Sequence, residues 1–304
     1  MNSILSSIMS FIMLIQALFG LGGIKDVGGF DKNDWMKDID GTKYISEISI
    51  PGTHNSGALY EPAYGVAKCQ KYTIGDQLDM GVRFLDVRAS VSFGKLKISH
   101  GIVYQGQNFE KFVNACYDFL KENPSETVIF SLRNEDGEGE KNSKFTSLLK
   151  KEINSNENMW YTQNKLPKLD EVRGRLVLIN RFDRECGLGL NAAHSWSNNS
   201  ALFSIYNDGY FINVQDVYAP ETIDIKKDAV ISFINNNYLP AVVTPALCIN
   251  FLSAVTSTGN IPETSAEMNE FFKEYSKTNP PFYGCMVFDY VTSDLCDIVI
   301  NANK

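Results

Sequence analysis

Residues 109–132 read FEKFVNACYDFLKENPSETVIFSL and contain a helix–strand unit from which the fold class follows. Apolar residues recur at helical spacing in the first half, which predicts an amphipathic helix over Phe109–Glu122 that Pro124 terminates. Thr127–Leu132 is then a nearly continuous apolar run, as expected of a parallel strand buried on both faces. A helix leading directly into such a strand is typical of an α/β protein.

The same alternation of strands and helices extends in both directions from this unit. Because no hairpin signal separates the expected strands, we predict a parallel sheet in one domain, an irregular or incomplete TIM (β/α) barrel over residues 30–304. The helices between the first strands are weakly marked, which favours an open barrel. The expected strands are Ile45–Ile50 (closed by Pro51-Gly52), Val82–Val91, Leu96–Ser99, Arg175–Asn180, Phe211–Val217, Ala246–Phe251 and Cys285–Tyr290, and the further helices are Ser143–Ile153, Glu221–Asn236 and Asp294–Ala302.

The first 23 residues form a separate segment. From Ile4 to Leu21 the chain is uncharged and rich in Ile, Leu, Met and Phe, and glycines follow. Such a run is typical of a signal peptide, although it is also near the lower length of a membrane-spanning helix. We therefore expect residues 1–23 to be a signal peptide or a membrane anchor, with a buried helix as the third alternative. The rest of the chain would be secreted and extracellular, or anchored through residues 4–21.

The net charge and the cysteine spacing argue against nucleic-acid binding and against a structural zinc site. The net charge of −8 and the pI near 5.0 argue against nucleic-acid binding, which needs basic patches. None of the six cysteines forms a C-x-x-C pair, which argues against a structural zinc site. In an exported chain they could form up to three disulfides, with buried thiols as the alternative. We expect a monomer.

Two of the three histidines directly follow expected strands. His54 follows the first strand in SIPGTHNSG, His100 follows the third in ISHG, and His194 lies in a polar loop. Catalytic groups of β/α barrels gather at the carboxyl ends of the strands. Any single histidine could be structural, but two at matching strand ends favour an acid–base pair formed by His54 and His100.

Charged residues also mark the ends of strands. Asp86 and Arg88 lie on one face of a strand, because they are two residues apart. They are either a structural ion pair or an arginine held for phosphate, whose oxygens match the planar guanidinium. Further charged residues that would form a polar mouth suited to an anionic substrate are Arg133, Arg181, Asp216 and Asp289.

These motifs resemble those of the bacterial-type phosphatidylinositol-specific phospholipase C family, with its X domain. The resemblance covers about residues 40–302, almost all of the chain beyond the N-terminal segment. The motifs are residues 48–56 (ISIPGTHNS), 77–88 (QLDMGVRFLDVR), 98–101 (ISHG), 123–132 (NPSETVIFSL), 174–181 (GRLVLINR), 213–218 (NVQDVY) and 287–290 (VFDY).

The resemblance implies an enzyme without metal or other cofactor, which cleaves phosphatidylinositol or a glycosyl-phosphatidylinositol to diacylglycerol and inositol 1,2-cyclic phosphate. His54 would be the general base for the inositol 2-hydroxyl, with Asp289 holding its tautomer. Arg88, with Asp86 beside it, would bind the phosphate oxygens where the calcium-dependent branch of the superfamily holds its metal. His100 would protonate the leaving diacylglycerol oxygen. The positions that match the inositol pocket are Arg133, Arg181, Asp216 and Tyr218.

Asn55 departs from the family pattern. The bacterial branch usually has aspartate after its first histidine, whereas the calcium-dependent branch has asparagine there as a ligand. We expect the Asn55 side chain to accept a hydrogen bond from His100, without a charge that would raise the pKa of that histidine.

Two other functions fit parts of the pattern. A metal-dependent glycerophosphodiesterase would need a carboxylate cluster, which Arg88 interrupts. A binding module for inositol lipids or glycans could keep the barrel and lose turnover, but it would not need Asp289 behind His54. The expected partner is a membrane surface that contains phosphatidylinositol or its glycosylated form. Aromatic residues in Tyr60–Tyr72 and around Trp196 suit such an interface, with ordinary surface packing as the alternative.

Overall fold

The structure is a computed structural model, in which residues 31–137, 140–237, 244–278 and 282–304 are described. The chain divides into two units, Met1–Asp31 and Lys32–Lys304, and the second contains all the helices and strands below. The expected signal peptide or anchor, residues 1–23, lies outside the described residues. Within the described residues, no helix has the length and apolar character that crossing a bilayer requires.

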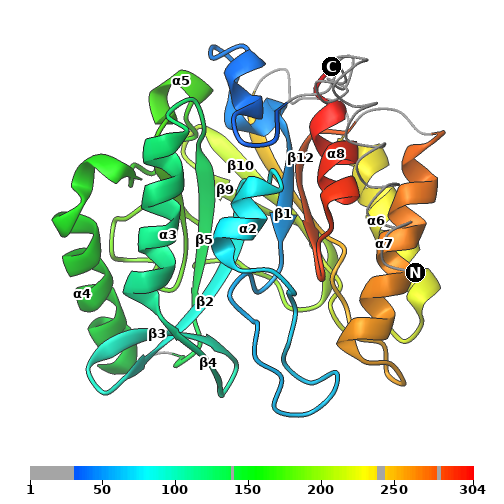
Figure 1. The fold of residues 1–304 in the computed structure, drawn as a ribbon, viewed down its shortest axis with the longest axis horizontal. Helices are drawn as coiled ribbons and strands as arrows, with labels where there is room; N and C mark the ends of the chain where they lie inside the picture. The colour runs from blue at the N-terminus through cyan, green and yellow to red at the C-terminus, as the bar shows by residue number, and fades with distance from the viewer. Residues whose placement is uncertain (1–30, 138–139, 238–243, 279–281) are drawn as a thin grey trace, which may run out of the picture. The chain divides into compact units, whose positions relative to one another are not determined.

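A single curled sheet is the centre of Lys32–Lys304 (Figure 1). Its strands are β1 (Ser49–Thr53), β2 (Phe84–Ser92), β3 (Lys95–His100), β4 (Val103–Asn108), β5 (Val128–Asn134), β6 (Trp160–Tyr161), β7 (Leu176–Arg181), β8 (Leu190–Asn191), β9 (Ser200–Asn207), β10 (Tyr210–Asp216), β11 (Ala246–Phe251) and β12 (Gly284–Phe288). The helices are α2 (Ile74–Asp79), α3 (Phe109–Glu122), α4 (Glu140–Ser155), α5 (Leu169–Val172), α6 (Ile223–Asn237), α7 (Ile261–Ser276) and α8 (Ser293–Asn301).

The strand order makes the barrel incomplete, as the sequence predicts. The order is β6-β7-β5-β2-β1-β12-β11-β10-β9, and β6 and β9 stay unpaired with each other in the part of the chain described. Every neighbouring pair along this path is parallel except β9–β10. The parallel strands therefore end at one edge, here called the carboxyl edge, which is at the bottom of Figure 1.

The unit read from residues 109–132 forms as predicted. α3 has the predicted bounds, and its apolar face is buried against β5. The ring of Phe130 lies 6.0 Å from the rings of both Phe109 and Phe112, centroid to centroid. Burying each such side chain stabilises the fold by about 1.5–3 kcal/mol, so this contact fixes α3 on the outside of the sheet.

The prediction that all strands are parallel is wrong in two places. β3 pairs antiparallel with β2 and with β4, and β9 pairs antiparallel with β10. The turn between β9 and β10 contains Asp208-Gly209, which is a known hairpin signal. The turn between β2 and β3 is Phe93-Gly94, with φ of 49° and 73°, and phenylalanine is unusual in that conformation.

The first predicted strand is also wrong in its bounds. Ile45–Glu47 is a short 3₁₀ helix, and β1 continues through Pro51 and Gly52 to Thr53. Gly52 is required there, because a Cβ atom on it would come within 2.9 Å of the Phe84 side chain in β2. This close approach of β1 to β2 brings the residue after Thr53 to the carboxyl edge beside β2. The other predicted elements form with small shifts of their ends. The elements that were not predicted are α2, α5, α7, β4, β6, β8 and β9.

Candidate active site

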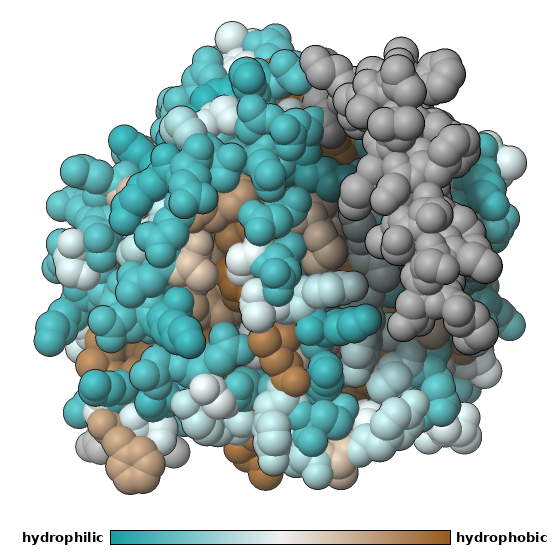
Figure 2. Space-filling model, in the orientation of Figure 1, coloured by the Kyte–Doolittle hydropathy of each residue, from teal (hydrophilic) through white to brown (hydrophobic). Residues whose placement is uncertain are grey.

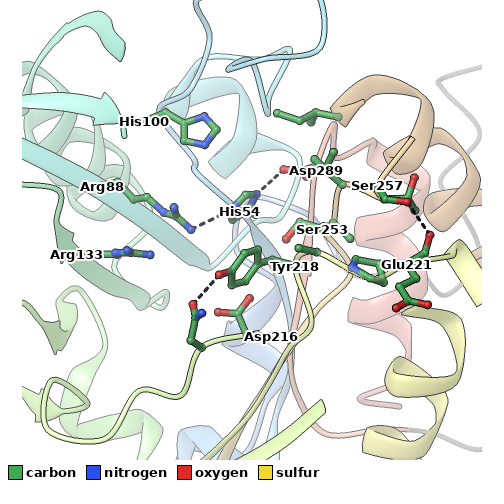
Figure 3. A pocket seen from close by; sticks show the side chains of 17 residues that line it. His54, Arg88, His100, Arg133, Asp216, Tyr218, Glu221, Ser253, Ser257 and Asp289 are labelled. Carbon is green, nitrogen blue, oxygen red and sulfur yellow. Dashed lines mark hydrogen bonds and ion pairs between the residues drawn. The ribbon is translucent and has the colours of Figure 1, made fainter. Parts of the chain in front are cut away.

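The ends of the strands surround a cavity of about 660 Å³ at the carboxyl edge. His54 directly follows β1, Asp289 directly follows β12, and His100 is the last residue of β3. Figure 3 shows His54 between Arg88 and Asp289, with His100 nearby and Asp216 and Tyr218 on the other side. The lining residues also include Arg133, Asn198, Glu221, Ser253, Ser257 and Ile261.

His54 is held by partners at both ring nitrogens. Its Nδ1 lies 2.7 Å from Asp289 Oδ1, and its Nε2 lies 3.1 Å from both Arg88 Nη2 and Asn55 Nδ2. The carboxylate can only accept and the two groups at Nε2 donate, so the proton of the neutral ring is on Nδ1. Nε2 therefore carries the lone pair that a general base requires, here shared with the donors Arg88 and Asn55.

Asp86 lies behind the two arginines of the site. Its side chain is fully buried, with Oδ1 2.8 Å from Arg181 Nη1 and Oδ2 3.4 Å from Arg88 Nε. Burial alone would raise the pKa of Asp86, but Arg88 and Arg181 outweigh it and hold that pKa well below its usual range. Asp86 thus stays ionised and fixes both guanidinium groups, and its position makes it a structural support of Arg88.

Glu135 was not identified from the sequence. Its Oε1 lies 3.7 Å from Arg88 Nη1 and 3.5 Å from Arg133 Nε, and its Oε2 accepts a hydrogen bond of 3.2 Å from the Gly101 amide. It therefore links the arginines to the turn beside His100. The strand period of two places Glu135 on the same side as Arg133, and this signal could have revealed it.

Gln70 was also missed. Its Nε2 donates to the carbonyl oxygens of His54 and Phe288, at 2.8 and 2.9 Å, and its Oε1 accepts from the Val291 amide at 3.2 Å. This one buried side chain joins the two strand ends that carry His54 and Asp289. No local pattern marks it, because Gln70 lies in a segment without helix or strand.

His100 faces His54 across the cavity. The ring centroids are 6.4 Å apart and the planes nearly perpendicular. His100 Nδ1 donates to the Ala67 carbonyl oxygen at 2.8 Å, which leaves Nε2 for proton exchange with a bound molecule. Burial lowers the pKa of His100, so its protonated form releases a proton readily.

The expected pairing of Asn55 with His100 is wrong. The Asn55 amide contacts His54 Nε2, while His100 Nδ1 binds Ala67. The backbone explains the difference: Asn55 has a left-handed φ of 44°, and its backbone N–H donates to Asp86 Oδ2 at 3.1 Å. This turn directs the Asn55 side chain toward His54.

Replacing Asn55 with aspartate should move the acidic limb of the pH–rate profile to higher pH. The new carboxylate would lie beside His54 Nε2 and favour the protonated ring, which cannot act as a base. The measurement is kcat/KM against pH with a soluble inositol phosphodiester. Asn198→Asp, which adds the same charge elsewhere on the cavity wall, is the matched control. Movement of the alkaline limb alone would show that the carboxylate acts on His100 instead.

The remaining predicted residues form a second part of the cavity. The Arg181 guanidinium lies 3.5 Å from the Trp196 ring centroid, and Trp196 Nε1 donates to Asp216 Oδ2 at 3.1 Å. Burial lowers the pKa of Arg181 to about 10, which keeps it charged at neutral pH. With Arg133 and Tyr218 these groups line a hollow of about 200 Å³. Trp196 is therefore part of the pocket wall, and its half-buried ring leaves less surface for a membrane than predicted.

A metal ion does not fit the cluster of ligand-type groups at this site. One atom each of His54, Cys69 and Asp289 lies within 4.8 Å of the others. The direct 2.7 Å contact of His54 with Asp289 leaves no space between them, and the guanidinium of Arg88 would repel a cation. Burial also raises the pKa of the Cys69 thiol well above its usual value, so it stays protonated.

The other histidine and the other cysteines lie apart from this chemistry. His194 is exposed and does not line the cavity. All six cysteines are free thiols and five are buried, so the alternative of buried thiols describes them better than the three possible disulfides.

Comparisons with known proteins agree with this geometry. The family model "Phosphatidylinositol-specific phospholipase C, X domain" matches residues 42–182. A 1-phosphatidylinositol phosphodiesterase of Staphylococcus aureus (strain Newman) is 28% identical over 299 residues, with 89% of this chain and 94% of the relative covered. Its counterpart in Listeria monocytogenes is 24% identical over 285 residues, with 89% and 84% covered.

Solved structures show the same fold. The F249X mutant of the phosphatidylinositol-specific phospholipase C from Staphylococcus aureus superposes with a TM-score of 0.80 at 26% identity, over 90% of this chain and 98% of that chain. The Listeria monocytogenes enzyme superposes with a TM-score of 0.74 at 22% identity, over 90% and 99%.

Proposed function

The chain belongs to the phosphatidylinositol-specific phospholipase C family, and from that premise we propose how its own residues cleave the lipid. The substrate is phosphatidylinositol or its glycosylated form, because both contain an inositol 1-phosphate diester with a free 2-hydroxyl. The observation that carries the proposal is His54, bonded to Asp289 at one nitrogen and to Arg88 at the other, in one cavity with His100.

The reaction is an attack by the substrate's own hydroxyl. His54 Nε2 takes the proton of the inositol 2-hydroxyl as its oxygen forms a bond to phosphorus. The Arg88 guanidinium stabilises the negative charge that develops on the phosphoryl oxygens. Asp86 and Glu135 hold this guanidinium in place. The bond from phosphorus to the diacylglycerol oxygen breaks, and His100 gives that oxygen a proton. An internal nucleophile gains from proximity, so no bound metal has to activate water.

The hollow beside the phosphate suits a polyhydroxyl ring. Asp216 offers a carboxylate, and Arg133 and Arg181 offer charged donors. Tyr218 is half exposed at the rim, with its hydroxyl 2.6 Å from Asn198 Oδ1. These groups support the assignment of the inositol ring to this hollow and of the lipid chains to the open side of the cavity.

We infer that the enzyme works on the surface of a membrane, as a monomer and without nucleic acid. Exposed aromatic residues in Tyr60–Tyr72 support contact with the bilayer, since Tyr64 is 71% and Tyr60 54% exposed. Export from the cell through residues 1–23, and the alternative of an anchor through residues 4–21, stay predictions.

Chelation of divalent cations should leave the activity unchanged. Arg88 supplies at the phosphate the positive charge that a calcium ion would otherwise supply. The measurement is phosphorus NMR of the products formed from phosphatidylinositol vesicles, with and without EDTA. The expected first product is inositol 1,2-cyclic phosphate, at equal rates in both samples. Loss of activity in EDTA that calcium restores, or a non-cyclic first product, would contradict the mechanism.

A further inference from the structure

Two turns at the ends of the strand that carries His100 expose large apolar side chains completely. Phe93, between β2 and β3, is 101% exposed, and Ile102, between β3 and β4, is 103% exposed. No heavy atom lies within 4 Å of a Cβ placed on either neighbouring glycine, Gly94 or Gly101. Both turns therefore project into solvent at the two ends of β3.

The Phe93 turn carries a second unfavourable feature. With φ of 49° at Phe93 and 73° at Gly94, it is a two-residue turn whose first position favours asparagine or glycine. A bulky residue in the left-handed region is strained, and strain that persists in a fold points to a function. Phe93 thus combines an exposed ring with a backbone conformation that another residue would adopt at lower cost.

The Ile102 turn adjoins the cavity, whereas the Phe93 turn lies at the other end of β3. His100 is the last residue of β3 and precedes the Gly101-Ile102 turn. Figure 1 shows β3 and β4 lying across the lower edge, which is the carboxyl edge, and Figure 2 shows hydrophobic groups projecting along that edge. The leaving oxygen that His100 would protonate belongs to the lipid. The turns are therefore on the side from which a bilayer substrate must enter.

The charged residues of β3, the strand between the two turns, indicate which kind of surface the turns contact. Lys95 is exposed on β3, and Lys97 lies on the same strand with its Nζ 5.7 Å from the Tyr104 ring centroid. Each lysine near an anionic membrane contributes about 1 kcal/mol of attraction. Two apolar side chains with lysines between them suit insertion into an anionic lipid surface, which the lysines attract and the apolar side chains enter.

We propose that β3 lies along the membrane and that Phe93 and Ile102 insert into it, which holds His100 at the lipid surface. This inference rests on the proposed function, because it names the surface through which the same site meets its substrate. It adds a contact apart from the Tyr60–Tyr72 segment.

The test is the double variant Phe93→Asn/Ile102→Ser. Asparagine suits the left-handed position and serine suits a turn after glycine, so the melting temperature should stay equal or rise. Binding to vesicles of phosphatidylcholine and phosphatidylinositol, measured by co-sedimentation, should fall about tenfold or more. Turnover on these vesicles should fall with it, while kcat/KM for a soluble inositol phosphodiester stays unchanged.

Tyr206→Asn is the matched control. Tyr206 is 61% exposed and precedes the turn between β9 and β10, at the edge of the sheet opposite the cavity. Its replacement should leave vesicle binding unchanged. An equal loss in the control, unchanged vesicle binding in the double variant, or parallel losses on soluble and vesicle substrates would each overturn the proposal. The proposal would also be overturned if the wild-type protein were a dimer, the double variant a monomer, and vesicle binding the same in both.

Failure of the proposed function would give a different result. The wild-type protein would then cleave neither the soluble phosphodiester nor the vesicle lipid, whatever the effect of the two substitutions on vesicle binding.

Discussion

Replacing His54 with alanine is expected to lower kcat by about 10²–10⁴-fold, the usual contribution of a general acid–base group. The substitution removes the nitrogen that accepts the 2-hydroxyl proton and leaves Asp289 without its 2.7 Å partner. His100→Ala should cost a similar factor, because the leaving oxygen would depart without a proton. The measurement is steady-state turnover of a soluble inositol phosphodiester, with circular dichroism to show that each variant is folded.

A control variant and the pH dependence of the rate test whether the loss of activity is specific to His54 and His100. His194→Ala, which changes an exposed histidine away from the cavity, should keep wild-type turnover. If it lost as much as the other two, the assignment of the pair would be wrong. The second comparison uses pH. His100 must be protonated to act as the acid, and burial lowers its pKa, so the alkaline limb of kcat/KM should lie below the ordinary histidine value of about 6.5.

Much of this site follows from the sequence because the parallel strands end at one edge. A residue directly after β1 and another directly after β12 must meet there, since these strands are neighbours with Thr53 opposite Phe288. That register gives the physical reason for the pairing of His54 with Asp289, which the sequence analysis took from the family resemblance. The same reasoning brings Arg88 beside Arg133, which are opposite each other in β2 and β5.

Features that depend on side-chain direction could not be predicted in this way. Asn55 turns toward His54 because of a left-handed backbone, and the sequence contains no direct sign of that φ. Gln70 acts through a long-range contact from an irregular segment. The turn at Phe93 was missed because its first residue is not one that two-residue hairpins favour. Local sequence patterns therefore predicted where the strands end. The directions of the side chains at those ends depend on tertiary packing, which the patterns do not contain.

Arg88→Lys should lower kcat by about 10²–10³-fold, the cost of removing a well-placed donor to a developing charge. Lysine keeps the positive charge but lacks the planar fork that binds two phosphoryl oxygens at once. Lysine is also the milder change for the fold, because Asp86 keeps its 2.8 Å contact with Arg181 and a cation remains near Glu135. Since the lost contact forms mainly as charge develops, kcat should fall much more than KM rises.

The controls for Arg88 separate its geometry from its charge. Arg184→Lys changes an arginine that is exposed and pairs with Glu185, so its turnover should not change. Arg133→Lys alters a guanidinium that is 45% exposed at the rim of the cavity and should act mainly on KM, because it meets the inositol side of the substrate. Arg88 is the one of these three that approaches His54, at 3.1 Å, so a phosphate next to that histidine must meet its fork. Wild-type kcat in Arg88→Lys would show that a single point charge is sufficient and that the fork has no part in the reaction.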